Sequence, residues 1–256
     1  MFHAPAFLQK YAPLRKLSFS LFRRYVEAFK PRFSVERRMG ALLLLDKRNK
    51  VDLHLLCAGA WEADRIAYLR DLVLRHKSGR RALFLDIGAH GGLYSVLLEK
   101  AVGFDRLVAF EPEPISLAQM RANVMMNDIG HKVEIVAKAV SDTSGTALFH
   151  VAHESNRGQS HLLRAEDVAR KTGRAVELAT VDAYVTELGA LVVAKIDVEG
   201  HEDEVLRGMR RTLHDNSAIV QLERNIDDIE EFERTIAATG LRRVHSIGQD
   251  HYFVKL

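Results

Sequence analysis

The sequence predicts a doubly wound α/β fold built on a mostly parallel sheet. Four short apolar segments without polar alternation, typical of strands buried on both faces, are residues 82–87, 106–110, 191–196 and 218–222. Helical patterns separate them at the spacing of βαβ units. Three glycines fall within the turn from Gly88 to Gly92, directly after the first of these strands. Because ligands in such sheets bind at the carboxyl ends of strands, we expect a site beside this turn.

The elements before the first strand are predicted from periodicity and turn residues. One helix fits between Pro13 and Pro31, where apolar residues recur every three or four positions. A β-hairpin is predicted over residues 40–57, with a strand at 40–46 and a return strand at 51–56. A helix should follow over residues 61–76. The residues expected on its buried side are Ile66, Leu69, Leu72 and Val73.

The remaining elements follow the same patterns. Helices are predicted at 93–100, 116–127, 202–211 and 227–239, and further strands at 132–140, 146–152, 241–246 and 251–255. The last two should form an antiparallel pair around Gly248. Residues 153–175 are polar and show no clear period, apart from a turn or two of helix at 164–171. Long insertions of this kind often form lids, so His150, His153 and His161 are candidates for substrate contact.

Charge and composition exclude several classes of protein. The net charge is +3, but the first 40 residues carry nine basic and two acidic side chains, so the rest is near −4. An acidic body argues against a general nucleic-acid-binding protein. Cys57 is the single cysteine, so no internal disulfide framework is expected. With no apolar run of about 20 residues and no signal-peptide pattern, we expect a cytoplasmic protein.

The spacing of the glycine turn bears on the identity of the nucleotide. A dinucleotide fingerprint places glycines as Gly-x-Gly-x-x-Gly, whereas this turn has Gly88, Gly91 and Gly92. Glu111 ends the second strand, where an acid can bind two ribose hydroxyls. The difference in glycine spacing disfavours a nicotinamide cofactor but leaves an NAD-type oxidoreductase as an alternative.

Five motifs in fixed order resemble the FkbM family of S-adenosylmethionine-dependent methyltransferases. They occupy residues 86–92, 109–114, 139–145, 180–182 and 195–208, and Lys195-Ile-Asp-Val-Glu-Gly200 is the most specific. The resemblance covers about residues 60–256. It implies a class I methyltransferase (Rossmann-like) fold, with a seven-stranded sheet and an antiparallel C-terminal strand. It also implies S-adenosyl-L-methionine as cofactor and methyl transfer to a hydroxyl of a sugar, glycolipid or secondary-metabolite acceptor.

The resemblance assigns cofactor roles to eight positions. The turn takes the methionine part of the cofactor with Asp86 orienting its amino end, Glu111 takes the ribose, and two residues after the third strand lie beside the adenine. The predicted cofactor residues are Asp86, Gly88, Ala89, His90, Gly92, Glu111, Ser141 and Asp142. His90 stands where the family commonly has Asn, which leaves its own role open. The alternative is that these acids cap turns and that Ser141 and Asp142 form an ordinary turn.

The predicted catalytic residues follow the fourth strand. They are Asp197, Glu199 and His201. In an extended chain, positions 197 and 199 point to the same side, so a carboxylate or imidazole there can take a proton from a hydroxyl. Glu223, which ends the next strand, could face the same pocket. The acids could instead cap the following helix or orient a divalent ion. Their spacing matches no closed metal site, so no metal ligands are predicted.

The N-terminal extension leaves three questions open. We place it at residues 1–59, before a methyltransferase domain at 60–256. Its helix could pack on the domain or a partner, or residues 1–38 could contact an anionic membrane peripherally, at the inner face. A second rival for the whole chain is a non-enzymatic module that binds a partner through this basic segment. The oligomeric state is not predicted.

Overall fold

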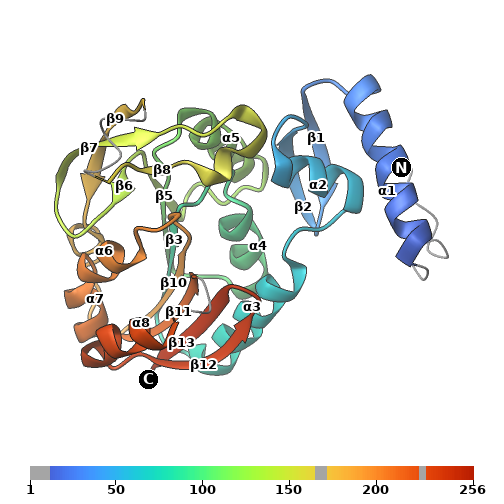
Figure 1. Cartoon of the computed structure of the whole chain (residues 1–256). Helices are drawn as coiled ribbons and strands as arrows, with labels where there is room; N and C mark the ends of the chain where they lie inside the picture. Colours follow the sequence, from blue (N-terminus) through green and yellow to red (C-terminus); the bar gives the residue numbers. More distant parts are fainter. Residues whose placement is uncertain (1–11, 165–171, 225–228) are drawn as a thin grey trace.

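A computed structural model describes residues 12–164, 172–224 and 229–256. Its central sheet has seven strands in the order β12-β13-β11-β10-β3-β4-β5 (Figure 1). The strands are β3 (Ala82–Ile87), β4 (Arg106–Phe110), β5 (Val133–Val136), β10 (Leu191–Ile196), β11 (Ser217–Glu223), β12 (Arg242–Ile247) and β13 (Asp250–Lys255). Strand β13 is antiparallel to both of its neighbours, β11 and β12, and the other neighbouring pairs in this sheet are parallel. The predicted class I methyltransferase fold is confirmed, including its antiparallel C-terminal strand.

Helices cover both faces of the sheet. On one side lie α3 (Ala63–Lys77), α4 (Leu93–Val102) and α5 (Pro114–Met126). On the other lie α6 (Glu202–Arg207), α7 (Arg210–Asp215) and α8 (Ile229–Ile236). The four residues predicted on the inner side of α3 are the buried ones. The single helix expected over 202–211 is wrong, because the chain breaks at Gly208, where a Cβ would lie 2.1 Å from the Ser141 carbonyl oxygen.

A second sheet of four strands projects beside the carboxyl edge of the first. Its order is β6-β9-β7-β8, with β6 (Ala139–Val140), β7 (Gly145–His150), β8 (His161–Leu162) and β9 (Arg174–Ala179). The predicted strand at 132–140 is therefore shared between two sheets, and β9 was not predicted. The helical turn expected at 164–171 falls almost entirely outside the described residues. The helix expected at 227–239 is described from Ile229 and ends in a short 3-10 turn, η5 (Ala237–Thr239).

The hairpin of the N-terminal extension differs from the prediction. Strand β1 (Phe33–Arg38) pairs with β2 (Ala41–Asp46), and Met39 and Gly40 turn between them with φ of 49° and 83°. The return strand predicted at 51–56 is wrong, because residues Lys50–Ala58 form helix α2. The physical reason is Asn49, whose side chain accepts the N–H groups of Val51 and Asp52 and so starts the helix.

Helix α1 (Ala12–Phe29) confirms the helix predicted between the two prolines. It packs on α2 at the outer edge of the molecule, with α2 and the β1–β2 hairpin between it and the main sheet (Figure 1). Val26 is its fully buried contact. Within the described ranges, no helix combines the length and the hydrophobicity needed to span a bilayer.

Candidate functional site

The glycine turn is anchored to two strands. The N–H groups of Gly88 and Ala89 donate to the Phe110 carbonyl at 3.1 and 3.0 Å, which ties the turn to the end of β4. Gly88 has a φ of 78°, and a Cβ there would lie 1.9 Å from the Asp197 carbonyl oxygen. Only glycine therefore lets the turn pack against the end of β10. The turn and the residues after β10 form one continuous wall.

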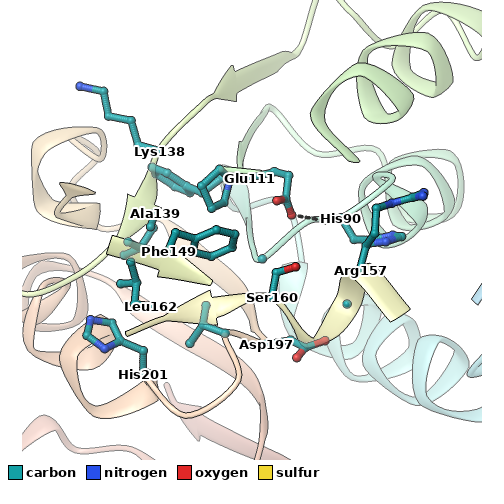
Figure 2. Close-up of a pocket in the computed structure, with 16 residues that line it drawn as sticks. His90, Glu111, Lys138, Ala139, Phe149, Arg157, Ser160, Leu162, Asp197 and His201 are labelled. Carbon is teal, nitrogen blue, oxygen red and sulfur yellow. Dashed lines mark hydrogen bonds between the residues drawn. The ribbon is translucent and has the colours of Figure 1, made fainter. Parts of the chain in front are cut away.

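A hollow lies where β3, β4 and β10 end. The small sheet and η2 (Glu154–Gln159) form its other side (Figure 2). In Figure 2, His90 and Arg157 lie at one end and His201 at the other. Residues that line it include Gly88, His90, Glu111, Pro112, Lys138, Ala139, Val140, Phe149, Arg157, Leu162, Asp197, Val198 and His201. The hollow is thus polar at its ends and apolar along the small sheet.

Glu111 presents a fixed carboxylate to this hollow. Its two oxygens accept the backbone N–H groups of His90 at 2.8 Å and of Glu113 at 2.7 Å. Burial raises the pKa of Glu111 to about 7, although both N–H groups favour its ionised form. The two hydrogen bonds hold the side chain in one orientation at the end of β4.

The other acid of the motif lies deeper. Asp86 is buried below the turn, where one carboxylate oxygen accepts the backbone N–H and the hydroxyl of Ser95 at 3.0 and 2.6 Å. Its second oxygen has no hydrogen-bond partner among the described residues. Burial raises the pKa of Asp86, and the charge of Lys195 opposes that shift. Asp86 therefore supports the first turn of α4 and does not line the hollow.

Four further predicted cofactor residues do not line the hollow. Ala89 and Gly92 belong to the glycine turn, and neither residue lines the hollow. Ser141 is buried with its hydroxyl 3.0 Å from Nε2 of His201. Asp142 points outward and pairs with Arg207 at 3.2 Å. The structure thus brings Ser141 to the hollow indirectly, through His201.

His90 contributes its backbone more than its ring. Its N–H holds Glu111, and its φ of 49° turns the chain there. The ring nitrogen Nε2 lies 3.4 Å from the Asn49 amide, on the side of the N-terminal extension. Burial, assisted by the positive charge of Arg157, lowers the pKa of His90 to about 4. The imidazole is therefore neutral near pH 7.

Arg157 is the main residue that the sequence did not identify. It lies in η2 and is 2% exposed. Its guanidinium donates to Asp46 at 2.8 Å and to Gln119 at 3.1 Å. Gln119 in turn donates to Asp52 at 2.7 Å, and burial raises the pKa of Asp52 to about 6. Arg157 therefore joins the insertion to the extension and to α5. Its sequence context is polar and gave no sign of burial.

A second cleft also has Asp197 in its wall. Carboxylates predominate in its wall, which contains Arg164, Asp197, Glu199, Gly200, Glu202, Asp203, Glu223, Arg224 and Gln249. Burial, followed by the charge of Asp197, raises the pKa of both Glu199 and Glu223 to about 7. Glu199 has a φ of 55°, an uncommon conformation for a residue with a side chain. Of the predicted catalytic residues, Asp197 and Glu199 share this cleft and His201 does not.

Lys195 sets the charge at the junction of the two cavities. Its Nζ donates to Asp197 at 2.7 Å and lies 5.2 Å from the centre of the Tyr94 ring. The adjacent carboxylates raise the pKa of Lys195 against the effect of burial. The Tyr94 hydroxyl donates to Glu62 at 2.9 Å, so Glu62 belongs to this network, whereas Trp61 packs against His54. Among the described residues, no group of three or more His, Cys, Asp and Glu side chains is arranged to hold a metal.

Comparison with known proteins assigns the family. A model of the methyltransferase FkbM domain matches residues 86–241, which is more than half of the chain. The chain belongs to this family. The match includes the glycine turn, Glu111 and the acids after β10, so the site lies within the FkbM domain.

Individual relatives are distant. The methyltransferase sdnD of Sordaria araneosa is 27% identical in an alignment of 154 residues, and the match covers 49% of this chain and 59% of that protein. This chain therefore spans less than two thirds of that relative. A solved FkbM methyltransferase from Methylobacillus flagellatus KT is 13% identical, with a TM-score of 0.49 over 94% of this chain and 59% of its own. A ribosomal protein L11 methylase from Lactobacillus delbrueckii subsp. bulgaricus is 12% identical, with a TM-score of 0.46 over 76% and 79%.

Proposed function

We propose that this FkbM-family chain transfers a methyl group from S-adenosylmethionine to a hydroxyl group of a sugar, glycolipid or secondary-metabolite acceptor. The observation that carries the proposal is the position of Asp197, which lines both the hollow and the acidic cleft. A cofactor in the hollow and an acceptor in the cleft would meet at this residue. Held geometry of that kind supplies much of the acceleration in group transfer.

The residues of the hollow fit the proposed cofactor. Glu111, fixed by two N–H groups, would accept the ribose hydroxyls, and the backbone at Gly88 would face the methionine part. Phe149, Val140 and Leu162 offer an apolar surface for adenine, beside the hydrogen-bonded pair of His201 and Ser141. We therefore assign His201 to the cofactor instead of to proton transfer.

The acidic cleft supplies the base. When bound, S-adenosylmethionine supplies the methyl group, whose bond to sulfur breaks as its bond to the acceptor oxygen forms. The hydroxyl proton passes to Glu199 or Glu223, whose pKa of about 7 suits a base near neutral pH. Lys195 fixes the orientation of Asp197, which can accept a hydrogen bond from a neighbouring acceptor hydroxyl.

The charge of the cleft favours one class of acceptor. Its wall has five carboxylates against Arg164 and Arg224, an excess that repels phosphorylated or carboxylated groups near the reacting oxygen. Carboxylates accept hydrogen bonds from several hydroxyls at once. We therefore propose a neutral or amino-bearing polyol at the point of methylation.

Labelled methyl transfer tests this proposal. The full-length protein is incubated with methyl-labelled S-adenosylmethionine and separate pools of neutral glycans, glycolipids and phosphorylated glycans. We expect a product heavier by one methyl group on oxygen, from a neutral pool. Fragmentation that locates the label on nitrogen or carbon would overturn the preference for oxygen.

Replacing Glu199 tests the assignment of the base. Glu199→Gln should lower kcat by about 100-fold or more, with a smaller change in KM, because it removes a proton acceptor. The wild-type rate should rise with pH and level off above about pH 7, as the raised pKa of the cleft carboxylates predicts. The control is Glu230→Gln, an exposed residue of α8. A Glu199→Gln variant with the wild-type rate and pH profile would assign the base to Glu223 or to none.

A further inference from the structure

The N-terminal extension carries a concentrated area of exposed apolar surface. Among the side chains that the structure describes, eleven large hydrophobic residues are exposed, and five of these lie between positions 21 and 35. We call these five the aromatic face. They are Leu21 (58% exposed), Tyr25 (51%), Phe29 (77%), Phe33 (41%) and Val35 (50%). The face contains all the aromatic residues in that set of eleven, and such grouping marks an interaction surface.

The helical part of the aromatic face forms a single stripe. Leu21, Tyr25 and Phe29 are spaced four residues apart on α1, so they lie on one side of the helix. The Tyr25 and Phe29 rings are 5.4 Å apart. Val26, on another side, is fully buried where α1 packs on α2. Because α1 lies at the outer edge of the molecule, the stripe is not needed to hold the helix in place (Figure 1).

The exposed side of β1 also carries aromatic, apolar and basic side chains. Along β1 the exposed residues alternate with half-buried ones, so Phe33, Val35 and Arg37 share the outer side. The guanidinium of Arg32 lies 4.9 Å from the centre of the Phe33 ring. Aromatic side chains next to cationic ones are the combination found where proteins meet the headgroup region of a bilayer.

The charge of this region is positive in its exposed parts. Arg24 and Arg37 are exposed beside the face. The nearby acids are neutralised, since Glu27 pairs with Arg23, and Glu36 pairs with Lys30. The first 40 residues carry +7 while the rest carries about −4. An anionic surface would therefore attract the N-terminal extension more than the rest of the chain.

We propose that the aromatic face docks on an anionic lipid bilayer. Tyr25, Phe29 and Phe33 would enter the headgroup region, with Arg24 and Arg37 against the phosphates. A second copy of the chain is the weaker occupant, because two identical basic faces would repel each other in a symmetric dimer. The proposal is independent of methyl transfer, and either can fail without the other.

Vesicle co-sedimentation of the full chain tests it. The probes are phosphatidylcholine vesicles with and without phosphatidylglycerol. We expect binding to the anionic vesicles only, weakened by salt. Tyr25→Ser/Phe29→Ser should lower the partition coefficient at least tenfold, and Arg24→Ala should lower it about fivefold. The matched control is Leu74→Ser/Leu188→Ser, which removes two apolar side chains exposed by 50% and 77% from other surfaces.

The outcomes separate the possible occupants. Selective loss in the Tyr25→Ser/Phe29→Ser variant, with unchanged circular dichroism, supports the docking face. Equal binding to neutral vesicles, or equal loss in the control variant, overturns it. Sedimentation velocity tests whether a second copy covers the aromatic face. If the wild type binds no vesicles and forms a dimer that Tyr25→Ser/Phe29→Ser dissociates, the face belongs to a second copy.

Discussion

Glu223 shows how a side chain in the site can oppose stability. Burial and the nearby carboxylates raise its pKa to about 7 in the folded protein, above the ordinary value of 4.5. The folded state therefore binds the proton more tightly than the unfolded state does. The stability contributed by that protonated form is lost as the pH rises through about 7. Above that pH, the ionised side chain works against the fold.

We predict that Glu223→Gln raises the melting temperature at about pH 8 and raises it less at about pH 5. The amide keeps the shape of the side chain and removes the charge. Scanning calorimetry at both pH values measures the difference. Glu177→Gln is the control, because Glu177 is exposed and its pKa is lowered by Lys138. An equal loss of stability at both pH values would mean that the Glu223 carboxylate supports the fold.

At the residue scale, sequence reasoning succeeded where chemistry is local. Gly88 and Glu111 directly follow strands whose apolar pattern is plain, so their place at the carboxyl edge could be predicted. Arg157 could not be predicted, because its partners Asp46 and Gln119 lie 111 and 38 positions away. Its burial depends on three separate elements folding together. The position of His201 after the fourth strand could be predicted, but its contact with Ser141, 60 positions away, could not.

At the element scale, Arg157 is the link between the insertion and the body. We predict that Arg157→Met lowers the free energy of unfolding by about 2–3 kcal/mol, because buried Asp46 loses one of its two guanidinium partners and keeps Arg32. Arg48→Met is the matched control. Arg48 pairs with Glu154 in the same region, but both side chains are exposed, so about 1 kcal/mol or less is expected.

Urea unfolding followed through Trp61 fluorescence measures both variants, since Trp61 is the single tryptophan. Equal losses of unfolding free energy in the two variants would show that the buried pair contributes no more than a surface pair. A cofactor affinity that falls in Arg157→Met but not in Arg48→Met would further indicate that the insertion shapes the hollow.

The wrong prediction for α2 has a clear physical origin. Residues 51–56 form a short segment in which Asp52 and His54 alternate with apolar side chains, and so few residues do not distinguish a strand from a helix. The deciding signals were Asn49 at the start and Gly59 at the end, where the backbone is left-handed with φ of 82°. The strand predicted at 40–46 is confirmed as β2, but its partner is β1, which precedes Gly40. The alternation of Phe33, Val35 and Arg37 was the signal for that strand.

At the scale of the whole molecule, periodicity was enough for the architecture. Strands β3, β4, β10 and β11 are short, largely apolar segments, and their alternation with helices leaves few topologies. The small sheet was less visible because β6 and β8 have only two residues each. The division between the extension and the domain at residue 59 stays a prediction. Asp46 and Asn49 of the extension contact Arg157 and His90, so the extension supports two residues that line the hollow.

The central claim is that the hollow binds S-adenosylmethionine through Glu111. Calorimetric titration with S-adenosylmethionine and with NAD tests this binding. The proteins compared are the wild type, Glu111→Gln and, as the control, Glu134→Gln, which changes an exposed residue of β5. We predict that wild type and control bind S-adenosylmethionine and not NAD, and that Glu111→Gln binds it at least about tenfold more weakly. Binding of NAD, or no binding of S-adenosylmethionine at millimolar concentration, would contradict the account.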